Sequence, residues 1–275
     1  MECMQKRMIG IEDLKNIQMD VLQVLHEFCT KNNIRYSLAC GTMLGAVRHK
    51  GYIPWDDDID IYMLREDYIK LVETFPKEYK NIKFATLERE PLWDKAYGQA
   101  YDTRTEMHEG EERDLKHRLY VGVGIDVYPI DEVPLDEKQW LAYNKKRLKL
   151  QWMLIYKYSV WRPGRKLLLN LGLMVAKVLL CPFSQRQIAI WISKYAQKYN
   201  GCKSGRVFET VQGILQKRPF DKACFDELVD MPFENRAFWG FKNHDAYLSN
   251  GYGDYMQLPP KEKQVNHHYY RAWWK

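Results

Sequence analysis

The sequence predicts an α/β (α+β) protein whose mixed sheet is flanked by helices, with a helical appendage and a loop-rich C-terminal segment. Helical and strand-like hydrophobic periods alternate through the first half, and only the helical period continues over residues 136–200. Pro and Gly punctuate the remainder. This order favours a mixed sheet covered by helices. With 275 residues, 46% of them hydrophobic, the chain is long enough to bury a substantial core.

The elements follow from local spacing. Apolar side chains recur near the 3.6-residue period over residues 11–32, which predicts a helix that ends at Lys31-Asn32-Asn33. The same spacing predicts a helix over 65–75, closed by Pro76, and a short helix is expected at 43–49. Alternating stretches predict strands at 34–40, 58–63, 82–86, 95–101 and 119–128.

Strand-like alternation stops near Val133-Pro134. We therefore predict a core domain over residues 1–133, a helical subdomain over 134–205 and a loop-rich segment over 206–275 that packs back on the core. Within the subdomain, helices are expected at 140–158 and 167–180, separated by Pro163-Gly164.

The helical subdomain carries the basic excess of the chain. Residues 136–200 hold 13 Lys and Arg against two acids, a net charge of +11, whereas the whole chain is only +6. Two interpretations remain open. An apolar stripe (Leu141, Leu148, Trp152, Ile155) packs on the core with solvated lysines outside, or the subdomain touches anionic lipid headgroups. No nucleic-acid-binding motif accompanies the charge, so nucleic acid is not an expected partner.

The expected location is cytoplasmic, with peripheral contact at the inner face of the membrane under the second interpretation. Residues 1–10 have no signal-peptide pattern, and the longest apolar stretch, 167–180, is shorter than the roughly 20 residues of a spanning helix. Six cysteines without CxxC spacing are typical of free thiols in a reducing compartment.

Three acids lie at alternate positions near the second predicted strand. Asp56, Asp58 and Asp60 are expected to share one face of it, where their like charges repel unless a cation neutralises them. Oxygen ligands favour Mg²⁺ or Mn²⁺. Asp126, a lone acid between Ile125 and Val127, is the best candidate for a further ligand.

A phosphate-binding turn is expected at Gly41-Thr42. Glycine permits close backbone approach, Thr42 is predicted to cap a helix that begins near Met43, and the N–H groups at a helix start hold phosphate. The basic residues that follow suit a diphosphate: Arg48, His49 and Lys50.

Three stretches, 41–60, 126–131 and 252–260, together resemble the LicD/fukutin-related family. This resemblance implies a nucleotidyltransferase fold like the palm of DNA polymerase β. It also implies a metal-dependent phosphotransferase that uses a CDP-activated donor. Asp58 and Asp60 match the family's metal-binding pair, Asp56 the accompanying acid and Asp126 the third acid, and Gly41-Thr42 match the phosphate-binding turn. The zinc-finger cysteines of the animal relatives have no counterpart.

Bacterial members of this family attach phosphocholine from CDP-choline to glycans such as lipopolysaccharide or teichoic acid. The expected partners are CDP-choline or a related CDP-alcohol and a lipid-linked or soluble glycan acceptor. Asp126 serves either as a metal ligand or as the base. The main alternative is an NTP-dependent nucleotidyltransferase that releases pyrophosphate. The Gly-Thr turn before the acids disfavours a DxD glycosyltransferase. The three aligned acids disfavour a binding module without enzymatic activity.

Aromatic residues crowd the C-terminal segment, where they either bind choline or form a core. Arg236, Arg271, His267 and His268 are weaker candidates for donor contacts. The aromatic residues concerned are Trp239, Tyr247, Tyr252, Tyr255, Tyr269, Tyr270, Trp273 and Trp274.

Overall fold

The computed structural model describes residues 7–109, 121–212, 218–266 and 270–275, and its centre is a seven-stranded mixed sheet. The parallel pair β2–β6 lies inside the sheet, and the other neighbouring strands run antiparallel. The main order is β1 (Ser37–Leu38), β2 (Asp60–Leu64), β6 (Gly124–Glu132), β4 (Gly98–Asp102) and β3 (Ile82–Ala85). β7 (Arg206–Glu209) pairs with the far end of β6 and with β8 (Phe220–Asp221).

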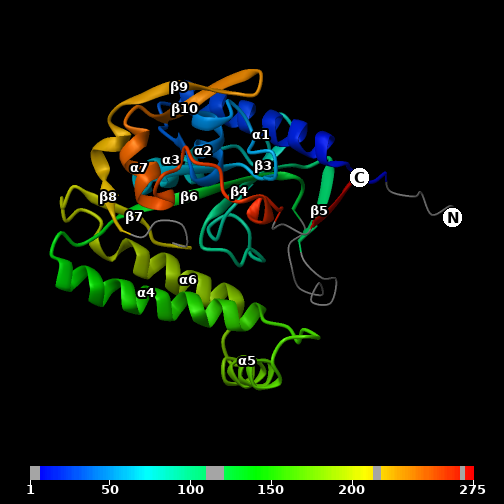
Figure 1. The fold of residues 1–275 in the computed structure, drawn as a ribbon, viewed down its shortest axis with the longest axis vertical. Coiled ribbons are helices and arrows are strands. Elements are labelled where there is room, and N and C mark those ends of the chain that lie inside the picture. The colour runs from blue at the N-terminus through cyan, green and yellow to red at the C-terminus, as the bar shows by residue number, and fades with distance from the viewer. Residues whose placement is uncertain (1–6, 110–120, 213–217, 267–269) are drawn as a thin grey trace.

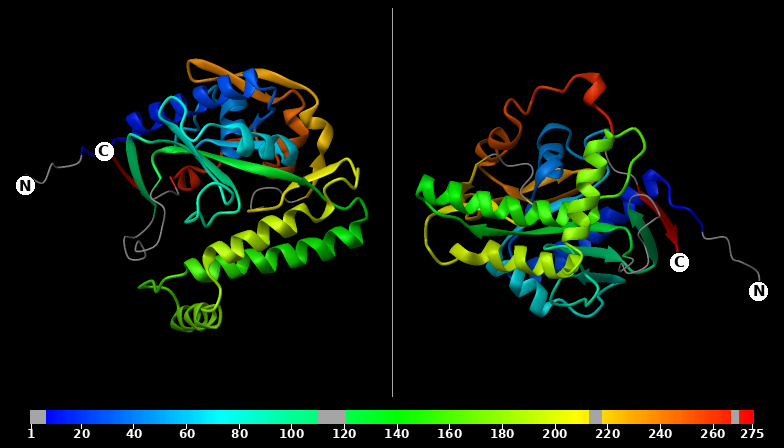
Figure 2. Two further views of the ribbon diagram at one scale, coloured as in Figure 1. Left: turned by 180° about the vertical axis from the view of Figure 1, so that it is seen from behind. Right: turned by 90° about the horizontal axis from the view of Figure 1, so that it is seen from below.

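Helices cover the sheet as the sequence predicts. Figure 1 and Figure 2 show α1 (Ile11–Lys31) on one side of the sheet and the pair α4 (Glu137–Tyr158) and α6 (Gln185–Ala196) on the other. The remaining helices are α2 (Cys40–Arg48), α3 (Arg65–Thr74), α5 (Leu167–Leu179), α7 (His244–Tyr252) and the 3₁₀ turns η2 (Gln197–Tyr199), η3 (Lys222–Phe225) and η4 (Lys261–Lys263). This confirms the mixed α/β class, and the likeness to a polymerase palm stays a prediction.

The predicted strands exist but their ends differ. The strand predicted at 119–128 is β6, which begins at Gly124 and continues through Pro129 to Glu132. Tyr128 and Pro129 pair with β2 on one side only, because on the other side β4 pairs as far as Val127 and β7 begins pairing at Ile130. A proline is tolerated where a strand has such an unpaired side.

The loop-rich description of residues 206–275 is wrong in part. Besides β7, β8 and α7, the segment contains the hairpin of β9 (Leu228–Phe233) and β10 (Arg236–Phe241), and β11 (Tyr270–Trp274), which pairs with β5 (Thr105–Glu109). The hairpin turn is Glu234-Asn235, in which Glu234 adopts φ +53°. It lacks the glycine that normally signals such a turn.

The apolar stripe predicted to pack on the core is exposed instead. Leu141, Leu148, Trp152 and Ile155 are 39–59% exposed. α4 buries the neighbouring face, which consists of Trp140, Tyr143, Arg147 and Gln151. The appendage is helical as predicted, but the interpretation in which this stripe faces the core is wrong.

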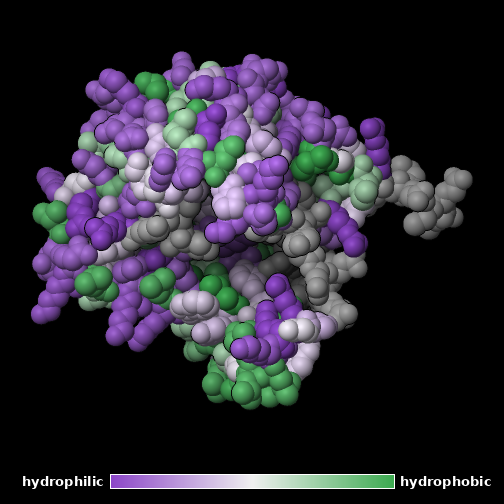
Figure 3. Space-filling view, viewed as in Figure 1, coloured by the Kyte–Doolittle hydropathy of each residue, from purple (hydrophilic) through white to green (hydrophobic). Residues whose placement is uncertain are grey.

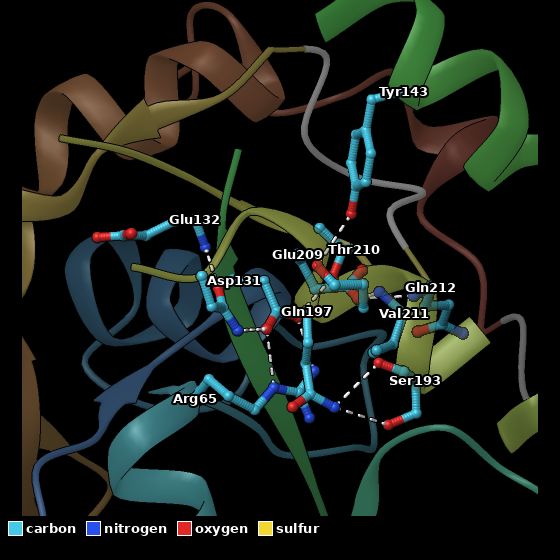
Figure 4. Close-up of polar contacts among 12 residues, drawn as sticks. Arg65, Asp131, Glu132, Tyr143, Ser193, Gln197, Glu209, Thr210, Val211 and Gln212 are labelled. Atoms are coloured by element: carbon cyan, nitrogen blue, oxygen red, sulfur yellow. Dashed lines mark hydrogen bonds and ion pairs between the residues drawn. The ribbon is translucent and has the colours of Figure 1, made fainter. Parts of the chain in front are cut away.

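A buried ion pair joins α3 to β6. The Arg65 guanidinium donates to both oxygens of Asp131, over 2.8 and 2.6 Å, and the carboxylate also accepts from Asn200 and from the Thr210 hydroxyl (Figure 4). Asp131 is fully buried and the Arg65 side chain is 9% exposed. Because Leu64 pairs with Ile130, this ion pair stands one step beyond the β2–β6 ladder.

We expect the Asp131→Ala substitution to lower the free energy of unfolding by about 3–5 kcal/mol, because it leaves the Arg65 charge buried without its partner. Urea denaturation at neutral pH measures this. Lys80→Ala, which breaks the exposed pair with Glu27, is the control and should leave the midpoint unchanged. Equal midpoints for wild type and Asp131→Ala would contradict the role of the ion pair.

Candidate functional site

The parallel pairing of β2 and β6 brings two of the predicted carboxylates together. Asp60 is the first residue of β2 and stands opposite Asp126 in the ladder. The Asp126 N–H donates to the Ile59 carbonyl over 2.9 Å, which fixes the two backbones at this point. Two acids that are 66 residues apart in the sequence therefore lie side by side at the start of the parallel pair.

The other two predicted acids lie close enough to act on Asp60. Burial, then the carboxylates of Asp58 and Asp126, and then that of Asp56 raise the pKa of Asp60 well above its ordinary value. The strand itself begins at Asp60, so the prediction that it begins at Asp58 is wrong. Asp56 and Asp58 lie in the segment leading into the strand and still contribute charge to the cluster.

Carboxylate oxygens are the donors that a hard divalent cation prefers. Among the described residues, however, no three His, Cys, Asp or Glu side chains already surround one point as a formed metal centre. The four acids therefore form a negatively charged cluster whose ion-binding role stays a prediction.

The N-terminus of α2 is fastened to Asp60 from both sides. The Asp60 N–H donates to the Thr42 hydroxyl over 2.8 Å, and its carbonyl accepts from the Ala39 N–H over 3.0 Å. The prediction that Thr42 caps a helix starting near Met43 is wrong: α2 begins at Cys40, and the Thr42 side chain holds the strand. A sequence cannot distinguish these uses of a hydroxyl, because both place threonine near a helix start.

Gly41 lies in the first turn of α2 against the acid cluster. A Cβ at this position would overlap the Oδ2 atom of Asp56, so only glycine permits the observed approach. In the first turn of a helix the backbone N–H groups have no intrahelical acceptor. Those of Gly41 and Thr42 therefore lie beside the acids, where a phosphate bridged by a cation would meet them.

The predicted basic group lies at the other end of α2. Nine helical residues span about 12 Å, so Arg48, His49 and Lys50 are far from Gly41. The Arg48 guanidinium donates to the carbonyls of Tyr255 and Gln257 over 2.8 and 3.4 Å. It therefore anchors the C-terminal segment, and phosphate binding by these three residues stays a prediction.

Aromatic residues that the sequence analysis did not single out surround the acids. The Tyr128 hydroxyl donates to Asp126 over 3.2 Å, and the Tyr128 ring packs on that of Tyr97 with centroids 4.5 Å apart. The sequence could have shown that Tyr128 lies beside Asp126, because residues two apart on a strand share a face. The Cys40 thiol contacts the Tyr62 hydroxyl at 3.3 Å, and its pKa is raised by burial and by Asp60.

The C-terminal aromatic residues divide into two groups. Tyr247 and Tyr252 belong to the site: the Tyr247 hydroxyl accepts from the Cys40 N–H over 3.0 Å. Burial, Cys40, Tyr247, Asp60 and Asp56, in that order, raise the pKa of the Tyr252 hydroxyl. Tyr255 is near the Arg48 end of α2.

The other aromatic residues lie elsewhere. Trp239 packs against Tyr36 and His26. Trp273 and Trp274 belong to β11, at the opposite end of the molecule from α7 in Figure 1. The two arginines lie apart from these groups: Arg236 bonds to Met19 and Asp20, and Arg271 pairs with His108 in the β5–β11 ladder. His267, His268 and Tyr269 lie outside the described residues, as does the side chain of Tyr270.

Carboxylates from two parallel strands beside a helix N-terminus define an α/β site suited to bind a phosphate and a cation together. The family model described as "LicD/FKTN/FKRP, nucleotidyltransferase domain" matches residues 33–159, which include α2, β2 and β6. The chain is 30% identical to the lipopolysaccharide cholinephosphotransferase LicD of Haemophilus influenzae over 96% of this chain and 98% of that protein. It belongs to the LicD family.

Two further similarities cover a short part of the chain. Uncharacterized proteins of Rickettsia prowazekii and Rickettsia typhi are 56% and 54% identical to this chain over 52 residues. These segments cover 19% of the chain and 20% and 17% of the two proteins.

The raised pKa of Asp60 makes a prediction about stability in metal-free buffer. A carboxyl with a higher pKa in the folded state than in the unfolded state binds its proton more tightly when folded, so stability falls as the pH rises above about 4. We expect the stability of Asp60→Asn to fall less with rising pH than that of the wild type. Thermal unfolding in EDTA from acidic to neutral pH measures this. Asp226→Asn, an exposed control, should keep the wild-type profile. An unchanged profile for Asp60→Asn would contradict the charge crowding.

Proposed function

We propose that this protein transfers phosphocholine, or a related phospho-alcohol, from a CDP-activated donor to a hydroxyl group of a cell-surface glycan precursor and releases CMP. The reaction type and the acceptor class come from the Haemophilus lipopolysaccharide cholinephosphotransferase, which aligns along nearly its whole length. The structural observation that carries the proposal is the pairing of Asp60 with Asp126 beside the first turn of α2.

In the reaction we propose, the acceptor oxygen attacks the phosphorus that bears choline. The bond from this phosphorus to the CMP oxygen breaks, CMP leaves with the bonding electrons, and the hydroxyl proton passes to a carboxylate. Asp126 is our candidate for this base or for a metal ligand. The Tyr128 hydroxyl, which donates to its Oδ2, orients it. The N–H groups of Gly41 and Thr42 would hold the diphosphate.

A divalent cation, Mg²⁺ or Mn²⁺, fits the donor set, because burial and neighbouring carboxylates already disfavour the ionised form of Asp60. The residues that would hold it are Asp56, Asp58, Asp60 and Asp126. When bound, the cation supplies positive charge that stabilises the phosphate oxygens. Since no formed centre exists among the described residues, we expect the carboxylates to move together as the ion binds.

A panel of donors tests the reaction. CDP-choline, CDP-ethanolamine, CDP-glycerol and CDP-ribitol are incubated with lipopolysaccharide, with Mg²⁺ or with EDTA, and CMP is quantified. We expect CMP from CDP-choline only with Mg²⁺. Pyrophosphate from ATP or CTP, without CMP from any CDP-alcohol, would favour the alternative nucleotidyltransferase.

Asp60→Asn should reduce transfer by roughly 10²–10³-fold, because it removes charge that holds the cation and the phosphates. The protein should remain folded by circular dichroism. Asp226→Asn is the matched control, since it makes the same chemical change at an exposed position and should retain full activity. Near-normal CMP release by folded Asp60→Asn would contradict the assignment.

Tyr252 offers a ring beside the acids that is half-buried rather than enclosed. A quaternary ammonium group gains about 0.5–2 kcal/mol on an aromatic face. Tyr252→Leu should therefore reduce the preference for CDP-choline over CDP-ethanolamine, measured as the ratio of their kcat/KM values. Tyr252→Phe keeps the ring and should preserve the ratio. The same ratio in both variants would show that Tyr252 does not recognise choline.

A further inference from the structure

Helix α5 exposes its apolar side chains and buries a polar one. Leu168, Val178 and Leu179 are 83%, 71% and 73% exposed, and Leu171 and Val175, three and seven residues after Leu168, are also exposed. This spacing places the five residues on one side of the helix, which we call the α5 face. A helix that packs in a globular core shows the reverse arrangement.

The polar side of α5 fastens it to the end of α4. Asn170, the buried residue of the helix, donates to the Arg162 carbonyl over 2.9 Å. Lys177 donates to the Ser159 carbonyl, and Lys157 on α4 donates to the Leu180 carbonyl, each over 3.2 Å. These bonds hold the helix with its leucines turned outward, so the exposure of the α5 face is built into the fold.

The apolar surface continues onto neighbouring elements. Trp152 and Ile155 of α4 and Trp161 in the connection to α5 are 46–51% exposed. In Figure 3 the hydrophobic residues gather at the lower edge of the molecule, over α5. Tryptophan is enriched at the interface between membrane and water.

The charge around this surface has one sign. Residues 138–200 contain 13 Lys and Arg and no Asp or Glu. Arg162 and Lys166 are exposed at the start of α5, and Lys145 and Lys149 are exposed on α4. An apolar face bordered by basic residues complements a bilayer that contains anionic lipids.

We propose that the α5 face docks on an anionic phospholipid bilayer, with α5 lying in the plane of the headgroups. The helix has 13 residues, about 20 Å, whereas the hydrocarbon core of a bilayer is about 30 Å thick. No helix in the described part of the chain meets the length and hydropathy required to cross a membrane.

A bilayer explains this surface better than a second copy of the chain. Figure 1 and Figure 2 show α5 projecting at one extreme of the molecule. Two copies joined through α5 would bring together two appendages that each carry a net charge of +11 over residues 136–200. That arrangement is repulsive.

Docking would also orient the acid site, a consequence that depends on the proposed function although the docking itself does not. The Tyr158 hydroxyl at the end of α4 donates to the Asp94 carbonyl, and Arg186 of α6 donates to the Trp93 carbonyl. The loop they contact leads into β4 through Tyr97, which packs on Tyr128. Hydrogen bonds and ring packing therefore connect the helices of the appendage to the acid cluster.

Vesicle flotation tests the proposal without any substrate. The full chain is mixed with vesicles of phosphatidylcholine alone or of an equal mixture of phosphatidylcholine and phosphatidylglycerol. We expect flotation with the anionic vesicles only. The double substitution Leu168→Glu and Val175→Glu should reduce partitioning at least roughly tenfold. Arg162→Gln and Lys166→Gln should each reduce it roughly fivefold.

Ile69→Glu is the matched control, because Ile69 is an apolar residue of α3 that is 41% exposed. It should float like wild type. Leu168→Ser with Val175→Ser provides a milder test if the double Glu variant is not folded by circular dichroism. Undiminished flotation of the folded α5 variants would overturn the proposal. So would a wild-type dimer that ignores vesicles and becomes monomeric in the α5 variants. Equal binding to both kinds of vesicle would overturn the claim that the surface selects anionic lipids.

Discussion

The register of one parallel strand pair determines how the acids of the candidate site are placed. At the far end of β2 and β6, Arg65 and Asp131 form a buried pair with two hydrogen bonds, and at the near end Asp60 stands opposite Asp126. A slip of one residue would separate the ion pair and turn the carboxylates to opposite faces. The ion pair at one end of the strand pair therefore helps to keep the mutually repelling carboxylates close together at the other end.

Helix α2 converts that strand register into a composite site. Its N-terminus is fastened to the strand by the Thr42 hydroxyl and to α7 by the Tyr247 hydroxyl, so residues from three distant parts of the sequence meet around Asp60. The first turn of the helix supplies backbone N–H groups, and the strands supply carboxylate oxygens. Two hydroxyl groups, those of Thr42 and Tyr247, therefore act together with the backbone bond from Ala39 to Asp60 in placing the helix.

The sequence was most informative where function and local pattern coincide. The glycine and threonine before a helix, the alternate aspartates and a lone strand acid were enough to select residues that the fold assembles around Asp60. Details set by distant partners were not accessible. Whether Thr42 caps its own helix or binds Asp60 depends on the position of β2. The strand at Thr105–Glu109 exists because the last residues of the chain pair with it. On α4, hydrophobic period alone selected the exposed side, since the buried face includes Arg147 and Gln151.

That error on α4 is itself informative about how charge and hydrophobicity are divided in the molecule. The appendage holds a net charge of +11 over residues 136–200, so the remaining chain carries about −5, and the acid cluster lies in that remainder. The basic excess of the chain and the acid cluster therefore lie in different parts of the sequence. The positive charge is placed instead beside exposed leucines and tryptophans, which a core would have buried. Folding alone does not account for that placement, whereas the docking on an anionic bilayer that we propose does.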